Sequence, residues 1–383
     1  MMRIPFMKPN LVKNKEYISY LNQIDDSRIY SNYGKLNTVF EEKILSQFYN
    51  GVGYVTTVNN ATIGLMTSIM LSKKDSGRYA IMPSFTFSAT AQAALWCGLE
   101  PYFVDIREED WCLNEKLLAK HIEKLGEEVA IIVPYATFGT VVDLSYYQNL
   151  IDNGLPVVID AAASFGSSYK GEGIESTFSG PIVYSFHATK SFGIGEGGLV
   201  YSKNKSFIKK VRQAGNFGFD TTRETVQIGL NSKMSEYSAA IGLATLSVFP
   251  EKKIIRQYIK EKYIVKMKKC GLLDNGWKVH QTRGEVAHQN VSVLCPKGCS
   301  GAVIVDLLNQ LGVEARTYFS PACHQQSFFS KHPSSDLYVT EDVASRVVNL
   351  PLWEELQEED IDYVVHALSN VDRKVKELSI YGA

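Results

Sequence analysis

Two ionisable residues, Lys190 and Asp160, lie in settings where a side chain can do chemistry. Lys190 follows a strand-like apolar run, residues 181–186, and lies beside a glycine-rich turn, residues 193–198, that leads into another strand. A lysine in this position is expected to be partly desolvated, and desolvation favours the neutral amine. A neutral amine can attack a carbonyl carbon and form a Schiff base.

Asp160 ends the apolar run Val157-Val158-Ile159, as expected of a strand buried on both faces of a parallel sheet. An acid at the carboxyl end of such a strand points into the crevice where α/β sheets bind ligands. Pyridoxal phosphate (PLP) needs both groups, because an amine attacks its aldehyde and a carboxylate keeps its pyridine nitrogen protonated. Alone, Asp160 could be a helix N-cap and Lys190 a surface charge, but the pair favours this cofactor.

The phosphate of the cofactor needs an anion site, and residues 58–62 at the start of a predicted helix are the best candidate. Backbone N–H groups and the positive end of the helix dipole converge there, although Asn60 or Thr62 could equally be a plain N-cap. Ser185 could add a hydroxyl group. Phe87 could lay its aromatic face on the pyridine ring, whereas the commoner place for a phenylalanine is the core.

The elements that must position these residues alternate between strand and helix as far as residue 201, which predicts a mostly parallel sheet with helices on both faces. After residue 235 the pattern changes and suggests a smaller α+β domain. We place the boundary near residue 249, between a large domain, 1–249, and a small domain, 250–383. The predicted strands are 79–82, 101–105, 130–133, 157–159, 181–186, 199–201 and 290–294, and the predicted helices are 41–49, 60–71, 89–96, 236–248, 251–269, 303–311 and 359–371.

Composition argues against several classes of protein. The 383 residues carry a net charge of −1, whereas nucleic acid or an acidic membrane usually requires a basic surplus in its partner. No apolar run approaches the length of a membrane span, and the N-terminus lacks the apolar core of a signal peptide. Of the six cysteines only Cys295 and Cys299 are close together, without a second pair at zinc-site spacing. We therefore expect reduced thiols, no metal site and a cytoplasmic location.

The chain resembles the sugar-nucleotide aminotransferases of the DegT/StrS type, within the aspartate-aminotransferase fold of PLP enzymes. The most specific matching segments are residues 160–162, 185–190, 195–198 and 229–234. The resemblance implies an α/β fold, in which a large domain has a mostly parallel seven-stranded sheet between helices and a smaller C-terminal domain is α+β.

By this resemblance, Lys190 carries the cofactor and Asp160 holds the pyridinium. The remaining cofactor contacts would come from backbone N–H groups, a hydroxyl, a stacked ring and an amide, at Ala61, Thr62, Ser185, Phe87 and Asn231. Asn231, otherwise a polar turn residue, would reach the phosphate bound to the neighbouring subunit, so the working unit would be a homodimer with shared active sites. Substrate contacts are expected from His187, Arg316, Tyr318 and His324.

Three positions depart from the family pattern. Ala163 replaces a frequent glutamine, so a contact to the phenolic oxygen of the cofactor is missing or supplied elsewhere. Ala61 replaces a usual glycine, which reduces backbone freedom, and Lys233 replaces a common arginine, which weakens bidentate recognition of a carboxylate. None of the three removes the chemistry.

The resemblance implies ping-pong transfer of an amino group from L-glutamate to a nucleotide-linked keto-sugar, with Lys190 moving the proton. By the same resemblance, Glu196 in the glycine-rich turn favours a 4-keto-6-deoxyhexose, most often dTDP-linked, in amino-sugar or O-antigen type glycan biosynthesis. Two alternatives remain open: a 3-keto-sugar aminotransferase, and a non-catalytic regulator or binding protein that keeps the fold. Related dehydratases carry histidine at the lysine position, so Lys190 disfavours that class.

Overall fold

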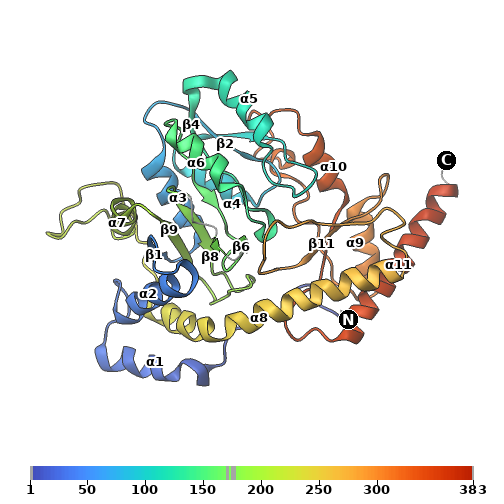
Figure 1. Ribbon diagram of the computed structural model, residues 1–383, viewed down its shortest axis with the longest axis horizontal. Helices are drawn as coiled ribbons and strands as arrows, with labels where there is room; N and C mark the ends of the chain where they lie inside the picture. Colours follow the sequence, from blue (N-terminus) through green and yellow to red (C-terminus); the bar gives the residue numbers. More distant parts are fainter. Residues whose placement is uncertain (1–2, 170–171, 174–177, 382–383) are drawn as a thin grey trace.

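A sheet lies at the centre of the larger part of the molecule (Figure 1). The computed structural model describes residues 3–169, 172–173 and 178–381. The strands of the central sheet are β1 (Tyr54–Val58), β2 (Tyr79–Pro83), β3 (Glu100–Val104), β4 (Val129–Ile132), β5 (Ile159–Asp160), β8 (Ile182–Ser185) and β9 (Gly198–Ser202), and a short hairpin pairs β6 (Ser168–Tyr169) with β7 (Glu172–Gly173).

The central strands are mostly parallel, as predicted. One group of strands has the order β1-β9-β8-β5 and the other the order β3-β2-β4. Parallel bridges from Ile132 to Val157 and from Tyr135 to Asp160 join the two groups. Among the described strands of this joined sheet, only β9 runs antiparallel to its neighbours. The carboxyl ends of β5 and β8, which carry Asp160 and lead to Lys190, are therefore adjacent and point the same way.

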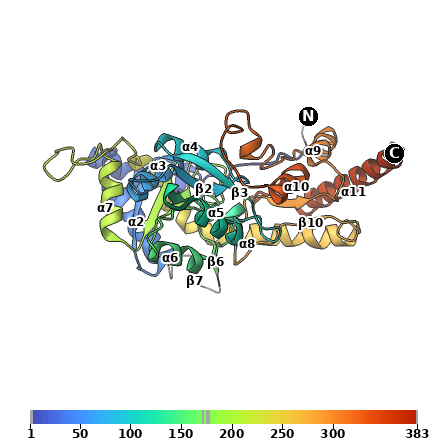
Figure 2. The same ribbon diagram turned by 90° about the horizontal axis from the view of Figure 1, so that it is seen from above.

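Helices cover both faces of this sheet (Figures 1 and 2). These helices are α1 (Asn14–Ser27), α2 (Lys35–Tyr49), α3 (Ala61–Ser72), α4 (Ser88–Trp96), α5 (Glu115–Leu125), α6 (Leu144–Asp152) and α7 (Lys205–Ala214). Side chains alternate along β2, as the pleat of a strand requires. Ala80 and Met82 join a buried apolar cluster with α3, α4 and α7, whereas Ile81 joins a second cluster with α2, α5 and α6.

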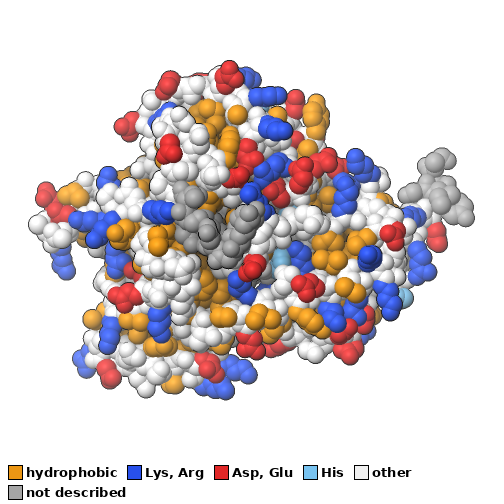
Figure 3. Space-filling view, viewed as in Figure 1, with side chains coloured by type: hydrophobic (Ala, Val, Ile, Leu, Met, Phe, Trp, Pro, Cys, Tyr) orange, Lys and Arg blue, Asp and Glu red, His pale blue; other side chains and the backbone are white. Residues whose placement is uncertain are grey.

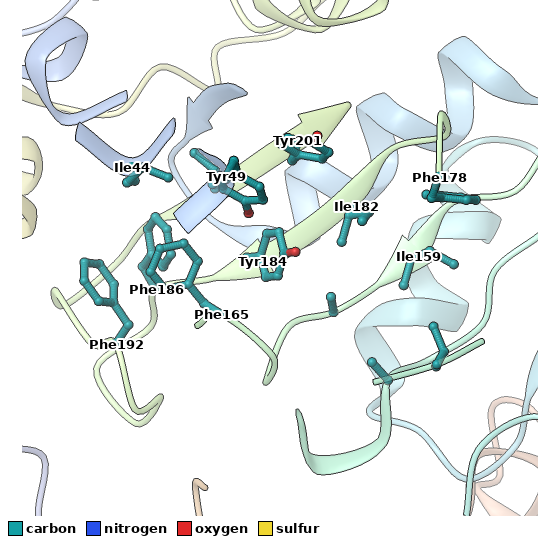
Figure 4. Packing of buried hydrophobic residues seen from close by; sticks show 14 of the residues in the cluster. Ile44, Tyr49, Ile159, Phe165, Phe178, Ile182, Tyr184, Phe186, Phe192 and Tyr201 are labelled. Atoms are coloured by element: carbon teal, nitrogen blue, oxygen red, sulfur yellow. The ribbon is translucent and has the colours of Figure 1, made fainter. Parts of the chain in front are cut away.

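Aromatic side chains fill much of the second cluster, next to β8 and β9 (Figure 4). Tyr49 stacks on Tyr201 with ring centroids 4.3 Å apart. Phe165 packs edge-on against Tyr184 and Phe186, with centroids 5.7 and 5.0 Å away. This packing fixes the strand from which the Lys190 loop departs.

Helix α8 (Glu236–Lys269) links the sheet to the C-terminal part of the molecule. The prediction of two helices separated at Pro250 was wrong, because the structure has one continuous helix. A proline removes a backbone N–H and crowds the preceding turn, but each half of α8 buries apolar side chains in a cluster. Residues up to Phe249 belong to the apolar cluster of the sheet, and Ile259, Tyr263 and Met267 belong to the C-terminal cluster. The domain boundary that we propose near residue 249 thus lies inside a helix.

The C-terminal part consists of an antiparallel sheet with helices packed against it, as expected for an α+β region. Its sheet has the order β10 (Lys278–Val279), β11 (Val291–Leu294), β12 (Val347–Leu350), and its helices are α9 (Gly301–Gln310), α10 (Tyr338–Arg346) and α11 (Glu358–Tyr381). Single 3₁₀ turns occur at Gly126–Glu128, Thr137–Gly139 and Cys323–Gln325. Ile4, near the N-terminus, is buried in this same apolar cluster.

Two surface features bear on function. Side chains of both charges are mixed over the face shown in Figure 3, and no helix within the described ranges is long and apolar enough to cross a membrane. The segment 216–231, which follows α7, extends away from the body of the molecule in both ribbon views (Figures 1 and 2). A bridge from Asn216 to Asn231 ties its two ends together. We call this segment the arm.

Candidate active site

A cleft of about 870 Å³ opens where the carboxyl ends of β5 and β8 meet the start of α3. Eight of the predicted site residues line it, namely Ala61, Thr62, Phe87, Asp160, Ser185, His187, Lys190 and Tyr318. Met7 from the N-terminus and Gln289, Asn290 and Phe319 from the C-terminal part line it as well. The cleft is therefore walled by segments that are far apart in the sequence.

The carboxylate of Asp160 is buried, with 3% of the residue exposed. Its Oδ2 accepts a hydrogen bond from the hydroxyl of Thr90 at 2.6 Å, and its Oδ1 accepts one from the N–H of Ala162 at 3.1 Å. Burial raises the pKa of Asp160, while these hydrogen bonds and the charge of Lys190 act to lower it. The two donors fix the orientation of the carboxylate and stabilise its charged form.

The amine of Lys190 lies half-buried in the same cleft. Its Nζ donates to Oε1 of Gln289 over 3.4 Å. Burial lowers the pKa of Lys190, and the negative charge of Asp160 opposes that shift. A lowered pKa increases the fraction of neutral amine near neutral pH, which is the form that attacks a carbonyl carbon.

The start of α3 lines the cleft and has the features of an anion site. Asn60 is the N-cap, because its side chain accepts a hydrogen bond from the N–H of Ile63 at 3.0 Å. A Cβ on Gly198 would lie 2.9 Å from the backbone N of Ala61, so only glycine lets β9 approach this turn so closely. Ser185, whose hydroxyl accepts from the N–H of His187 at 3.3 Å, lines the same cleft. Backbone N–H groups, a helix dipole and a hydroxyl suit a phosphate group.

Two phenylalanines close in sequence have opposite surroundings. Phe85 is fully buried and packs edge-on against Trp111 and Phe138, with centroids 5.8 and 6.1 Å away. Phe87 is 59% exposed, at the N-cap of α4, and its ring lines the cleft. Core packing, the alternative considered for Phe87, is therefore the role of Phe85. The exposed ring of Phe87 can cover a planar ligand in the cleft.

The chemistry of these groups fits PLP. Asp160 can hold the ring nitrogen, Lys190 can hold the aldehyde carbon, and Phe87 can cover one face of the ring. The start of α3, together with Ser185, can hold the phosphate. All of these residues line the same cleft. Next to the start of α3, the backbone leaves no room for a residue larger than Gly198.

Three predicted residues do not line the cleft within the described part of the chain. Arg316 forms an ion pair with Glu314. Nδ1 of His324 shares a 2.7 Å hydrogen bond with the hydroxyl of Ser84, and Nε2 of the same ring lies 3.3 Å from Oε1 of Glu341. Asn231 is exposed at the base of the arm.

The sequence interpretation missed several residues that contribute to the site, namely Met7, Thr90, Gln289, Asn290 and Phe319. Gln289 and Asn290 directly precede β11 (Val291–Leu294), and two amides at the start of a strand were the only available signal. Met7 offered none, because its place depends on the packing of the N-terminus against the C-terminal part.

Comparison with known proteins agrees with this geometry. The sequence profile of the DegT/DnrJ/EryC1/StrS aminotransferase family matches residues 12–369. The chain belongs to this family. It is accordingly an aminotransferase that uses PLP, which confirms the enzyme class and the cofactor predicted from the sequence.

Individual members of the family are similar over nearly the full length. A crystal structure from Bacillus cereus, assigned to the PLP-dependent aminotransferases, is 49% identical, with a TM-score of 0.94 over 95% of this chain and 99% of that one. A protein of Mycobacterium tuberculosis, Rv3402c, is 32% identical over 97% of this chain and 90% of its own length. The dTDP-4-amino-4,6-dideoxy-D-glucose transaminase of Escherichia coli is 28% identical over 93% of this chain and 95% of its own length.

Proposed function

We propose that the protein transfers an amino group from L-glutamate to a nucleotide-linked 4-keto-6-deoxyhexose, with dTDP as the nucleotide. One observation carries this proposal: Glu196, Lys190 and Asp160 line the same cleft. Glutamate at position 196 is the feature that favours a 4-keto over a 3-keto sugar. Similarity to the dTDP-amino-sugar transaminase of E. coli supports the same choice.

In this proposal, Lys190 and Asp160 have different roles in the reaction. When bound, PLP supplies an aldehyde carbon and a ring that withdraws electrons from the carbon losing its proton. Lys190, as a neutral amine, takes the proton from Cα of glutamate in the first half-reaction and returns a proton to the sugar carbon in the second. Asp160, oriented by Thr90 and Ala162, holds the proton on the ring nitrogen.

A homodimer with shared active sites is part of the proposal. Asn231 is exposed at the base of the arm. The arm also exposes apolar side chains, with Phe217 47% and Ile228 62% accessible. Apolar groups on a projecting segment favour contact with another protein surface, and a second copy of this chain is the partner we infer. We further infer a cytoplasmic role in the biosynthesis of amino-sugar glycans.

A substrate panel tests the function. Purified protein with PLP and glutamate would be incubated with 4-keto-6-deoxy and 3-keto sugars linked to dTDP, UDP and GDP. We expect a new amino sugar, identified by mass spectrometry and NMR, mainly from the dTDP-linked 4-keto compound. Amination at C3 instead would overturn the position assigned, and no amination of any sugar nucleotide would overturn the substrate class.

A further inference from the structure

The first residues of the chain cross from the C-terminal part to the catalytic cleft. Ile4 pairs with Val313 in a parallel bridge, and its backbone N–H donates to the carbonyl of Gly312 at 3.0 Å. The ring of Phe6 is buried and lies edge-on to that of Tyr318, with centroids 5.7 Å apart. We call residues 3–10 the strap.

The strap is fixed on both sides of Met7. Before it, the carbonyl of Pro5 accepts from Nε1 of Trp353 at 3.1 Å, and the N–H of Phe6 donates to the carboxylate of Glu314 at 3.0 Å. After it, the Lys8 ammonium lies 4.9 Å from the centre of the Trp353 ring and pairs with a carboxylate. Farther along, Lys252 donates to the carbonyl of Asn10. These contacts on both sides of Met7 restrict the positions that its side chain can adopt.

Met7 is one of the residues that line the catalytic cleft. It shares that lining with Lys190, Gln289 and Tyr318. It also lines a much smaller cavity of about 10 Å³, which is walled by the strap, by the loop that carries Lys190 and by residues around Trp353. Met7 therefore borders both the catalytic cleft and this small cavity.

We propose that Met7 is a specificity-determining residue for the amino acceptor, contacting the C6 methyl group of a 6-deoxy sugar. This inference rests on the proposed function. A thioether fits apolar groups well and offers no hydrogen-bond donor, so a hydroxymethyl group at the same place loses hydrogen bonds to water without full replacement. An apolar pocket discriminates against one added hydroxyl by up to roughly 100-fold.

The test uses the PLP-loaded protein and two sugars that cannot react, dTDP-6-deoxyglucose and dTDP-glucose. Calorimetry would give the ratio of their dissociation constants for the wild type, Met7→Leu and Met7→Gln. We expect a wild-type preference for the deoxy sugar, retained in Met7→Leu and reduced by about 10-fold in Met7→Gln, which supplies an amide to the added hydroxyl. Lys8→Gln is the matched control, because Lys8 lies on the same strap and pairs with Glu355.

The outcomes separate the two proposals. An unchanged ratio in Met7→Gln, or an equal change in Lys8→Gln, would overturn the role of Met7 while leaving the substrate class intact. Failure of the wild type to bind either dTDP sugar would overturn the proposed substrate class, and the role of Met7 with it. Melting temperatures of the variants would show that each is folded, and Met7→Ser, which also supplies a hydrogen-bonding group, provides the reading if Met7→Gln is not folded.

Discussion

The two walls of the cleft are built in different ways. The inner wall, formed by Asp160, Ser185 and Lys190, consists of residues at or just after the ends of adjacent parallel strands. The outer wall, formed by Met7, Gln289 and Tyr318, comes from the strap and from loops of the C-terminal part. The inner wall is backed by two apolar clusters on either face of the sheet, whereas the outer wall depends on contacts between distant segments.

This difference indicates that the inner wall performs the chemistry and the outer wall selects the substrate. Groups that perform the chemistry need an orientation that does not change from one substrate to the next, and strands fixed by a buried sheet provide it. Groups that select the substrate can lie on segments whose sequence varies without disturbing the sheet. Substitutions in the inner wall should therefore lower turnover strongly. Substitutions in the outer wall should lower turnover only slightly and chiefly alter affinity and preference.

The largest effect is expected at Lys190. Lys190→Ala removes the amine that we propose to hold the aldehyde and to move the proton, so amine transfer should fall by about 10⁴-fold or more. Turnover would be followed by the glutamate-dependent formation of amino sugar. Lys120→Ala, an exposed lysine on α5, is the control and should remain active. Substantial turnover in Lys190→Ala would refute the role of this residue.

Asp160→Asn tests the other member of the inner wall. The amide keeps an oxygen that can accept a hydrogen bond but cannot hold the proton on the ring nitrogen, so the rate should fall by about 10²- to 10³-fold. The rate of the glutamate half-reaction, read from the cofactor absorbance, measures this. A rate close to the wild type would mean that another group supports the ring nitrogen.

The same substitution has a predicted effect on pH dependence. Burial lowers the pKa of Lys190 and Asp160 raises it, so the rate of PLP capture should rise with pH to a plateau whose midpoint lies below the ordinary lysine pKa of about 10.4. Removing the negative charge in Asp160→Asn should move this midpoint to lower pH. Absorbance after PLP addition, measured across a pH series, tests the sign, and a shift to higher pH would contradict it.

Substitutions of Thr90 test whether the orientation of the Asp160 carboxylate affects turnover. Thr90→Val keeps the shape of the side chain and removes the 2.6 Å hydrogen bond to Asp160. A hydrogen bond to a charged group contributes about 1.5–3 kcal/mol, so turnover should fall by roughly 10- to 100-fold. Thr90→Ser retains the hydroxyl and should recover most of the rate. Equal loss in both variants would point to packing instead of the hydrogen bond.

The smallest effect is expected in the outer wall, at Gln289. Gln289→Ala removes the long hydrogen bond from Lys190, 3.4 Å from Nζ to Oε1. A neutral hydrogen bond contributes about 0.5–1.5 kcal/mol, so kcat should fall only about 2- to 10-fold. A steady-state comparison of kcat and KM with the wild type measures this. A loss as large as that in Asp160→Asn would remove the distinction between the two walls.

Much of the sheet followed from local patterns. Six of its strands were predicted, because each is a short apolar run with a clear boundary. The seventh, β1 (Tyr54–Val58), was missed because two threonines interrupt the apolar pattern, and both are buried. The break expected at Pro250 also failed, since burial on two apolar clusters outweighs the local preference of proline.

The amino-acid sequence by itself determined the chemistry of this protein. Lys190 and Asp160 each follow a buried strand, and parallel strands place their carboxyl ends at one edge whatever surrounds them. Tertiary structure decided which side chains face the substrate. Tyr318 lines the cleft while Arg316, two residues earlier, does not, and Met7 meets Gln289 there because the strap packs against the C-terminal part. Such contacts depend on the packing of distant segments, which no local pattern specifies.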